Sequence, residues 1–270
     1  MALPAPSPNT ACLVTGASSG IGEQLARGLA RRGYSLVLSA RREARLSALA
    51  EELQRTTGVD ALALPCDLAK PDARHRLVQA IEKSDQAVSI LVNCAGLGSG
   101  GAFLQLDQAA ELDMVGVNVD AIVDLCGVFA PAMVRQGGGA ILNVASIAGF
   151  APLPRQATYA ATKAFVISFS HALHAELKHS GVTVTTLCPG PTRTDFSAAS
   201  GRQVQGAMEK LPTFMTSAPD EVAEAGLRAL EHGRRHVTVG LVNKVNGLSA
   251  YFTPRTLELA MMDRFYPVEA

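Results

Sequence analysis

The sequence has no excess of charge of either sign. Lysine plus arginine number 24, aspartate plus glutamate number 24, and the formal net charge at pH 7 is +0. Proteins that bind nucleic acids or anionic membranes use a strongly positive surface, because neutralising phosphate groups supplies much of the binding free energy. The balance therefore removes the electrostatic case for either partner.

Long apolar runs and targeting features are also missing. No run of 18 consecutive uncharged apolar residues occurs, so we expect no membrane span. The stretch from Met1 to Pro8 has neither a basic start nor a long apolar core, and we expect no signal peptide there. Internal repeats are absent, which excludes a solenoid. The sequence predicts a soluble, cytoplasmic protein.

Paired cysteines are not present. The five cysteines are an odd set, each within or beside an apolar segment: Cys12, Cys66, Cys94, Cys126 and Cys188. We predict buried, reduced thiols rather than disulfides or a metal site. His171 and His174 share a predicted helix, but only Glu176 lies near them as a third ligand, so we predict no metal.

Short apolar runs alternate with helical patterns as far as about residue 241. The runs read as strands at 11–15, 34–39, 61–65, 88–93, 140–145, 182–187 and 236–241. Repeated strand-helix-strand units predict right-handed crossovers, and hence an α/β fold with a doubly wound parallel sheet of about seven strands and helices on both faces. At 270 residues, one domain over 1–270 suffices.

A glycine-rich turn follows the first predicted strand. Gly16-Ala17-Ser18-Ser19-Gly20-Ile21-Gly22 stands between that strand and a segment with helical periodicity. Glycines let the backbone approach a pyrophosphate, whose charge is stabilised at the helix N-terminus. The context fits a dinucleotide site, although the spacing also fits an ordinary turn with an N-cap serine.

Polar and glycine residues follow several other strands. Gly16–Gly22, Asp67, Asn93, Ser146 and Pro189 all come directly after a predicted strand. The carboxyl ends of parallel strands meet at one edge of the sheet, where ligands bind at the point of strand-order reversal. These positions are therefore predicted to converge on one crevice.

Tyr159 and Lys163 are four residues apart, and Ser146 lies thirteen residues before the tyrosine. A spacing of four puts both side chains on one face of a helix, as in many ordinary amphipathic helices. A phenol with a pKa of about 10 is a poor base at neutral pH, but a nearby ammonium favours the phenolate. With the Ser146 hydroxyl to hold the reacting oxygen, the set predicts proton transfer in carbonyl or alcohol chemistry.

In order and spacing, these motifs resemble those of the short-chain dehydrogenase/reductase family. The resemblance runs from about residue 9 to about residue 240 and implies a Rossmann fold. It rests on Thr15–Gly22, Asn93–Gly96, Ser146, Tyr159 and Lys163. Cys94 stands where the family commonly has asparagine.

The resemblance implies a role for each catalytic residue. Ser146 orients the substrate oxygen, and Tyr159 is the general acid/base. Lys163 lowers the pKa of Tyr159 and binds the nicotinamide ribose. Asn118 holds a water in the proton relay, although an asparagine in this mostly apolar helix also fits a helix bend.

The family pattern also implies a set of cofactor contacts. Asp67 matches the residue that contacts adenine, and Thr192 and Thr194 match the element that fixes the carboxamide, with Thr192 in place of the usual valine. The residues that we expect to bind the cofactor are Gly16, Ser18, Ser19, Gly20, Ile21, Gly22, Arg41, Arg42, Asp67, Leu68, Asn93, Ala95, Gly96, Tyr159, Lys163, Pro189, Gly190, Thr192 and Thr194.

The end of the second strand predicts the type of cofactor. An NAD site places a carboxylate near this point to bind the ribose 2′-hydroxyl, but here Ser39 stands there and Arg41 and Arg42 follow. Guanidinium groups suit a 2′-phosphate, so we predict NADP(H). Alternatively, the two arginines merely begin an exposed helix.

Two later segments are interpreted by their apolar content. The segment 195–217 resembles the family's variable substrate lid, which suggests an apolar or mixed substrate. The extension 242–270 is expected to cover the substrate pocket, pair subunits or touch a membrane, in that order. Helices at about 109–135 and 158–179 have broad apolar faces like the two-helix dimer surface of the family, so the resemblance implies a homodimer, with a homotetramer left open.

We therefore predict a soluble NADP(H)-dependent oxidoreductase acting on a small ketone, aldehyde or secondary alcohol. A reductase of 3-oxoacyl thioesters is the main alternative within enzymes. A cofactor-binding sensor or scaffold is the alternative outside them, because fold does not fix function.

Overall fold

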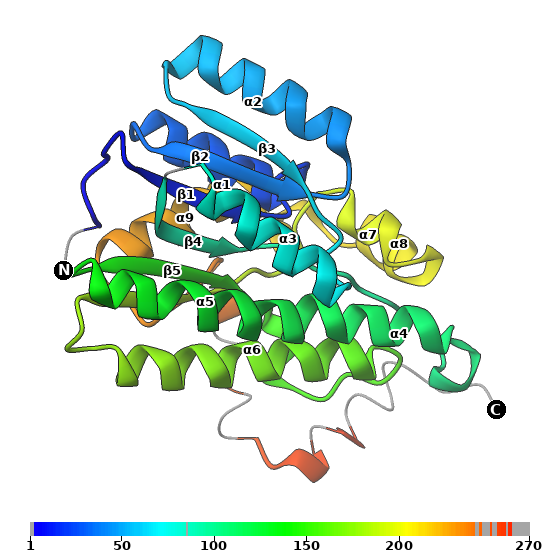
Figure 1. Ribbon diagram of the computed structural model, residues 1–270. Helices are drawn as coiled ribbons and strands as arrows, with labels where there is room; N and C mark the ends of the chain where they lie inside the picture. The colour runs from blue at the N-terminus through cyan, green and yellow to red at the C-terminus, as the bar shows by residue number, and fades with distance from the viewer. Residues whose placement is uncertain are drawn as a thin grey trace.

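A parallel sheet of seven strands forms the centre of the computed structural model (Figure 1). The structure describes residues 3–84, 86–240, 243–244, 249, 253–257 and 259–260. The strand order across the sheet is β3-β2-β1-β4-β5-β6-β7, and each neighbouring pair is parallel. The predicted doubly wound parallel sheet is therefore confirmed.

The strand bounds agree closely with those expected from the sequence. They are β1 (Thr10–Thr15), β2 (Ser35–Ala40), β3 (Ala61–Pro65), β4 (Ala87–Asn93), β5 (Gly139–Val144), β6 (Val182–Cys188) and β7 (His236–Thr238). The expected strand at 236–241 is too long. It ends at Thr238, and Gly240 has a φ of 87°, a left-handed conformation that does not continue a strand.

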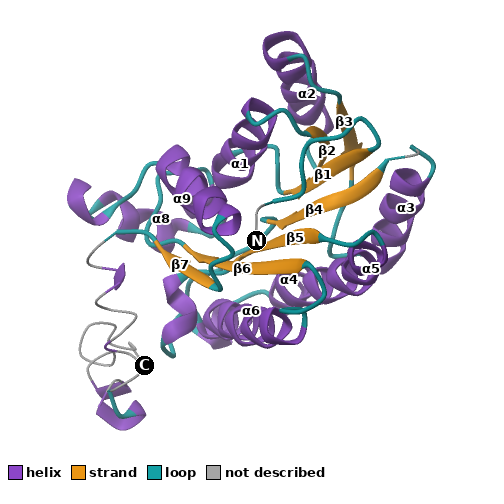
Figure 2. Cartoon of the chain, turned by 90° about the vertical axis from the view of Figure 1, so that its left-hand side faces the viewer, coloured by secondary structure: helices purple, strands orange, loops and turns teal. Residues whose placement is uncertain are grey.

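Helices cover both faces of the sheet, as Figure 2 shows. The first layer consists of α1 (Gly20–Arg31), α2 (Glu43–Thr57) and α9 (Pro219–Glu231). The second consists of α3 (Pro71–Glu82), α4 (Gln108–Val115), α5 (Ala121–Arg135) and α6 (Ala157–Glu176). The predicted helix at 158–179 ends earlier than expected, at Glu176, and is followed by a turn.

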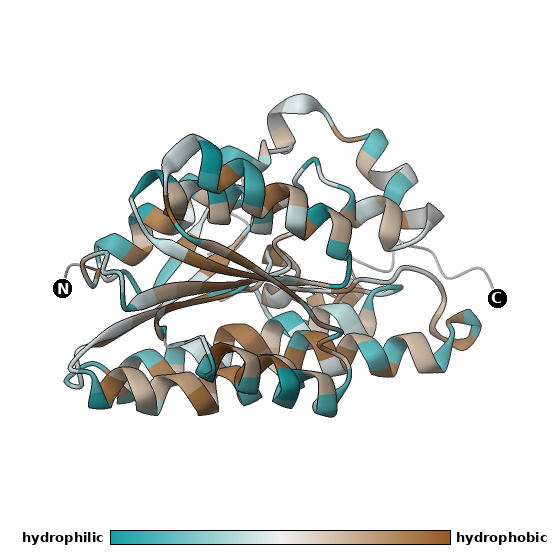
Figure 3. Ribbon diagram, turned by 45° about the horizontal axis from the view of Figure 1, so that its top comes forward, coloured by the Kyte–Doolittle hydropathy of each residue, from teal (hydrophilic) through white to brown (hydrophobic). Residues whose placement is uncertain are grey.

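The hydrophobic residues form one core on each side of the sheet. Leu25, Leu46 and Leu227 belong to the core under the first layer, and Leu77 and Leu125 to the core under the second. Because both faces of the strands are covered, β4 and β5 read as mostly apolar runs, whereas β6 contains three threonines among its apolar residues although it is buried throughout. Figure 3 shows the apolar strands between the two helix layers.

One long helix in the second layer contains an irregular turn. The π-helical segment η2 (Gly116–Asp120) joins α4 to α5, and Ala121 N–H donates to the Gly116 carbonyl five residues earlier. By length and composition alone, this helix (Gln108–Arg135) is long and apolar enough to cross a membrane. Half of its apolar segment is buried, as in the core helix of a soluble protein, so the evidence for a span is weak.

Short helical segments complete the loops at the carboxyl edge of the sheet. They are η1 (Phe103–Gln105), η3 (Ile147–Phe150), α7 (Phe196–Ala199), α8 (Arg202–Glu209) and η4 (Thr213–Met215). The expected substrate lid at 195–217 thus contains two short α-helices and a 3₁₀ turn. Most of the extension at 242–270, with the role expected for it, lies outside the described residues.

Candidate active site

The predicted site residues converge at the carboxyl ends of the strands. β1 lies between β2 and β4 in the sheet, so the chain reverses its direction of winding at β1 and leaves a crevice between the loops after β1 and β4. The loops after β5 and β6 meet beside it, because Ile147 N–H donates to the Pro189 carbonyl at 3.0 Å. Four loops that are distant in sequence therefore border one crevice.

Thr15 fixes the glycine-rich turn to the loop after β4. Its Oγ1 donates to the Val92 carbonyl at 3.2 Å and accepts from the N–H groups of Cys94 (3.0 Å) and Ala95 (3.1 Å). Thr15 is 1% exposed, so water does not compete for these bonds. One buried hydroxyl thus sets the position of both walls of the crevice.

Glycine is required at two positions of this turn. Gly16 has a φ of 69°, and a Cβ there would lie 2.8 Å from the Ala95 backbone. A Cβ on Gly22 would lie 2.3 Å from the Gly16 carbonyl oxygen. The absence of side chains leaves a cradle next to the N-terminus of α1, where the N–H groups can hold an anionic group such as a pyrophosphate.

The serines of the turn do not cap the helix. Ser19 is the N-cap of α1, with an extended backbone, but its side chain makes no capping hydrogen bond. The hydroxyls of Ser18 and Ser19 instead accept from the Arg42 guanidinium. Ile21 packs against the core of the first layer. The N-terminal N–H groups of α1 therefore lack a side-chain cap, as an anion site requires.

Ser39, which was expected near the ribose, has its side chain in the core. Ser39 is 0% exposed, and its Oγ finds no partner among the described residues, so it cannot reach a ribose. The adjacent Ala40 ends the strand, at 9% exposure. Because alternate strand residues face opposite sides of a sheet, Ser39 and Ala40 face opposite helix layers, and Ala40 belongs to the first-layer core. Ala40 also carries no carboxylate.

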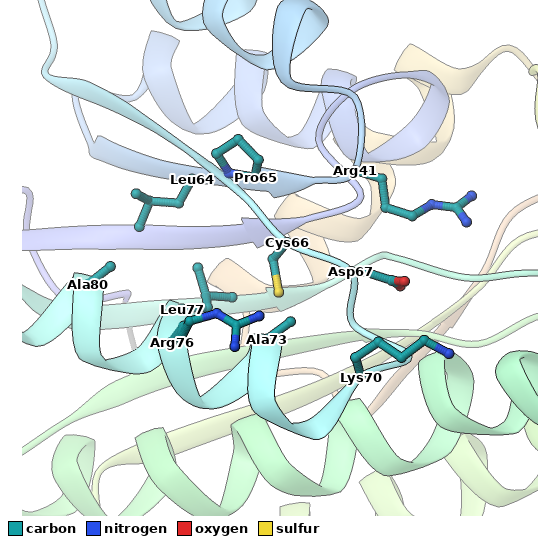
Figure 4. A pocket seen from close by; sticks show the side chains of 10 residues that line it. All are labelled: Arg41, Leu64, Pro65, Cys66, Asp67, Lys70, Ala73, Arg76, Leu77 and Ala80. Carbon is teal, nitrogen blue, oxygen red and sulfur yellow. The ribbon is translucent and has the colours of Figure 1, made fainter.

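Arg41 and Arg42 point to different parts of the cofactor side. Arg42 contacts the serines of the glycine-rich turn, whereas Arg41 lines a depression of about 600 Å³ together with Asp67 and Lys70 (Figure 4). Asp67 Oδ1 accepts from Ala69 N–H at 3.2 Å. This depression lies between the end of β3 and α3, which supply most of its lining.

Two of the expected cofactor residues have their side chains in the core. Asn93 is 2% exposed, and its amide donates to Asn143 Oδ1 at 2.9 Å, which joins β4 to β5. Leu68 is 5% exposed, and its carbonyl accepts from Arg74. Neither side chain faces the crevice. Gly96 does border it, because a Cβ there would contact Asn118 Oδ1 and Lys163 Nζ at 3.4 and 3.5 Å.

Asn118 lies in the π-helical turn and is fully buried. Its Oδ1 accepts from Leu97 N–H, and its Nδ2 donates to the Leu97 carbonyl, both at 2.9 Å. Nδ2 also donates to Thr162 Oγ1 on α6 at 3.0 Å. The side chain therefore holds the loop after β4 against the catalytic helix. Asn118 thus lies in the irregular part of the helix and is also the residue for which the sequence suggested a role in the site.

The catalytic candidates Ser146, Tyr159 and Lys163 lie together. Tyr159 and Lys163 occupy neighbouring turns near the start of α6, with Nζ 5.8 Å from the centre of the tyrosine ring. A hydrogen bond to Ser146 favours the phenolate of Tyr159 and so acts to lower its pKa. Lys163 is 4% exposed, and its Nζ donates to the Val144 carbonyl at 3.0 Å.

Burial has the largest effect on the pKa values of Tyr159 and Lys163. Burial raises the pKa of Tyr159 to about 12 and outweighs the hydrogen bond from Ser146. Burial also lowers the pKa of Lys163 to about 8. Nζ of Lys163 lies 5.8 Å from the centre of the Tyr159 ring, and the lowering of the pKa of Tyr159 by Lys163 stays a prediction. Tyr159 is a neutral phenol at neutral pH, which is the proton-donating form.

The loop after β6 lies over the glycine-rich turn. A Cβ on Gly20 would lie 3.0 Å from Thr194 Cγ2, and a Cβ on Gly190 would lie 2.1 Å from Asn243 Nδ2. Thr192 Oγ1 donates to the Gly190 carbonyl at 2.9 Å. Thr192 also pairs with Ser217 as a short parallel bridge. The two ends of the segment 195–217 are thus joined, as in a loop that closes on itself.

Phe196 brings this segment onto the catalytic tyrosine. The rings of Phe196 and Tyr159 are 5.8 Å apart and tilted by 45°. A Cβ on Gly98 would lie 2.7 Å from the Phe196 ring, and a Cβ on Gly100 would lie 2.4 Å from Val204 Cγ2. Glycines after β4 therefore permit close packing of the segment. The sequence contains a signal for this close packing, because Leu97–Gly101 includes three glycines. No role was predicted for them.

Comparison with known proteins identifies the family of this arrangement. Residues 10–205 match the model for short chain dehydrogenases. The chain is 34% identical over 236 residues to a probable oxidoreductase, EphD, of Mycobacterium tuberculosis, covering 83% of this chain but only 40% of that protein's length. It is 34% identical over 259 residues to a putative ketoacyl reductase of Streptomyces coelicolor, covering 88% and 97% of the two chains.

Solved structures agree in fold and differ in cofactor. A short-chain dehydrogenase of Sphingobium yanoikuyae in complex with NADPH has a TM-score of 0.80 at 32% identity, with 97% and 98% of the chains covered. A short-chain dehydrogenase/reductase of Burkholderia phymatum in complex with NAD has a TM-score of 0.81 at 25% identity, with 93% and 95% covered.

Proposed function

The chain belongs to the short-chain dehydrogenase/reductase family, and on this premise we propose that it is an NADP(H)-dependent reductase of ketones or aldehydes, or dehydrogenase of secondary alcohols. The observation that supports this most directly is the buried group of Ser146, Tyr159 and Lys163 beside the glycine cradle. When bound, the cofactor supplies or accepts the hydride at its nicotinamide ring.

The side chains of the site handle the proton and the position of the substrate. In reduction, Tyr159 Oη gives its proton to the carbonyl oxygen while Ser146 Oγ holds that oxygen in place. Lys163 holds the ribose next to the ring of Tyr159, and Asn118 holds the wall between Gly96 and the catalytic helix. A neutral phenol at rest favours the reductive direction at neutral pH.

The substrate that we propose is apolar or of mixed polarity. The segment 195–217 serves as its lid, with Phe196 as the side chain next to Tyr159. An aromatic ring beside the proton donor favours a carbonyl compound with an apolar substituent. The fold alone does not select such a substrate, because this part of the chain differs most among enzymes that share a fold.

The preference for NADP(H) is proposed on the basis of Arg42. Its guanidinium already lies against the hydroxyls of Ser18 and Ser19, beside the N-terminus of α1. Ala40 offers no carboxylate that would repel a 2′-phosphate or bind a 2′-hydroxyl. Arg41 lies on the adenosine side of the same loop and adds a second positive charge there.

Arg42→Ala is expected to weaken NADPH binding by about tenfold to a hundredfold, because a charge-assisted hydrogen bond contributes roughly 1.5–3 kcal/mol. NADH binding should change by less than about threefold. Dissociation constants for both cofactors, measured by fluorescence titration, test this. Arg31→Ala on the first-layer helix α1 is a control that removes an arginine elsewhere. Equal losses for NADPH and NADH would assign Arg42 to the general stability of the turn.

A second function, reduction of 3-oxoacyl thioesters, is favoured by the similarity to the putative ketoacyl reductase. A panel of free ketones, aldehydes and 3-oxoacyl thioesters, each with NADPH and NADH, tests both proposals. We expect the highest kcat/KM with a free apolar ketone and NADPH. A thioester that exceeds every free ketone would establish the second function instead.

We also propose that the enzyme is a homodimer of the cytoplasm. Leu112 on α4, Val123 on α5 and Phe165 on α6 are exposed at 64%, 41% and 39%, and this apolar surface suits a second copy of the chain better than water. All five cysteines are free, which fits a reducing compartment. Light scattering should give twice the monomer mass. A monomer at micromolar concentration would contradict the dimer.

A further inference from the structure

One carboxylate of the lid lies among the arginines after β2. Asp195 Oδ2 is 3.1 Å from Arg45 Nη1 and 3.6 Å from Arg42 Nη1. Asp195 follows Arg45 by 150 residues in the sequence, and Arg45 lies in the first turn of α2. Asp195 therefore supplies the carboxylate that this arginine pair holds.

Arg42 faces acceptors on both sides. Its guanidinium donates to the hydroxyls of Ser18 and Ser19, and it also faces Asp195. The same guanidinium is the one that we assign to the 2′-phosphate. A guanidinium has a limited number of donors in a fixed plane, so a phosphate and a carboxylate compete for them.

The backbone around Asp195 connects this pair to the catalytic tyrosine. Thr194, one residue before it, lies against Gly20 of the glycine-rich turn. Phe196, one residue after it, contacts the ring of Tyr159. Asp195 thus stands at the first position of the lid, between the cofactor side and the substrate side of the site.

How strongly a 2′-phosphate competes with Asp195 for Arg42 depends on the exposure of these side chains and on the charges of the two anions. Arg42, Arg45 and Asp195 are 44%, 55% and 64% exposed, so each ion pair is weak and screened by salt. A phosphate monoester carries about −1.5 to −2 charges at neutral pH, compared with −1 for the carboxylate. The phosphate therefore displaces Asp195 from Arg42, but against the repulsion of the carboxylate that stays nearby.

We propose that Asp195 is a specificity-determining residue that limits the affinity for the 2′-phosphate: it is an internal counter-ion of Arg42 and Arg45 that the phosphate of NADP(H) must replace. This inference rests on the proposed preference for NADP(H). It adds that the preference is set by a residue of the lid as well as by the loop after β2. It also makes the start of the lid sensitive to which cofactor is bound, since binding and displacement are linked reciprocally.

The test uses the full-length protein with 2′,5′-ADP and 5′-AMP, which differ only in the phosphate on the 2′ position. Calorimetric dissociation constants are measured for the wild type, for Asp195→Asn and for Glu209→Gln. Glu209 is also an exposed carboxylate of the lid, but its recorded partner is Gln205 rather than an arginine. Circular dichroism confirms that each variant is folded.

We expect Asp195→Asn to bind 2′,5′-ADP about threefold to tenfold more tightly than the wild type, with 5′-AMP changed by less than about twofold. The gain should shrink at about 0.5 M salt, because the repulsion is between exposed charges. Glu209→Gln should bind both ligands as the wild type does.

Two kinds of failure are distinguishable. If the wild type binds 2′,5′-ADP no more tightly than 5′-AMP, the proposed preference for NADP(H) is wrong, and the inference about Asp195 is lost with it. If the wild type does prefer 2′,5′-ADP but Asp195→Asn leaves its affinity unchanged or weakens it, only the inference is overturned. A similar gain in Glu209→Gln, or an equal gain for 5′-AMP, also overturns it, because the effect is then one of overall charge.

Discussion

Tyr159→Phe should reduce kcat for carbonyl reduction by about a thousandfold or more, at the upper end of the range for loss of a general acid. The substitution removes the transferable proton and keeps the ring, which is 9% exposed and packed against Phe196. NADPH binding should therefore remain within about threefold of the wild type, as measured by fluorescence titration. A variant that keeps more than about a tenth of the wild-type kcat would show that another group donates the proton.

The pH dependence of the wild type is the matching control. The pKa of Tyr159 is raised to about 12 by burial, so the phenol is protonated at and above neutral pH. Reduction should vary little from about pH 6 to about pH 8, whereas oxidation of the alcohol should rise with pH, because it needs the phenolate. The pKa of Lys163, lowered to about 8, adds a change of charge beside the tyrosine above that pH. An oxidation rate that falls as pH rises would contradict this assignment.

The second large effect concerns the cradle. Gly22→Ala should raise the dissociation constant for NADPH by about a hundredfold, because the new Cβ would lie 2.3 Å from the Gly16 carbonyl oxygen and 2.8 Å from the Gly16 carbonyl carbon. Both atoms belong to the backbone, so the turn itself must move. A binding titration together with a thermal melt measures the effect.

Gly127→Ala is the matched control for that substitution. A Cβ at Gly127, on α5, would meet nothing within 4 Å, and alanine is favoured over glycine in a helix by about 1 kcal/mol. This variant should bind NADPH normally and melt at the same or a higher temperature. If Gly22→Ala also bound NADPH normally, the turn would have to be much more adaptable than its contacts with Ala95 and Thr15 indicate.

The periodicity of the apolar residues was sufficient to predict the sheet. The spacing of Ser146, Tyr159 and Lys163 was sufficient to predict that these residues lie together. Apolar runs between helical patterns located all seven strands to within about a residue at most ends, because strands in the middle of a covered sheet are rich in apolar residues. Tyr159 and Lys163 meet because helical spacing fixes their relation, and Ser146 joins them because the end of β5 lies beside α6. These features depend on local geometry, which a single sequence carries.

The direction of individual side chains was harder to predict. Ser39 was expected near the ribose, but its side chain is fully buried in the core. Asn93 follows a strand as a ligand residue would, yet its amide is used to join β4 to β5 through Asn143. In both cases the sequence gives the position along the chain, whereas the role depends on which side of the sheet the side chain faces.

Contacts between distant segments lay outside what the sequence could indicate. Asp195 and Arg45 are 150 positions apart, and their ion pair depends on how the loop after β6 folds over the turn after β1. The pKa of Tyr159 also depends on such packing. A lysine four residues away suggested a lowered pKa, whereas burial by the surrounding loops has the larger effect and raises it.

The π-helical turn at Gly116–Asp120 contains one residue more than a regular α-helical turn. This single residue changes the rotation of α4 relative to α5. Each residue of a regular α-helix turns the chain by about 100°, so one extra residue in a turn rotates everything before it by that amount relative to everything after it. Here α5 keeps its contact with the sheet, and the phase of α4 is shifted. Removing a single residue between Gly116 and Asp120 would restore a regular helix, but it would rotate α4, with its buried Met114, by about 100° relative to α5 and turn Asn118 away from Leu97. The position of Asn118 in the wall of the crevice thus depends on one extra residue in the helix.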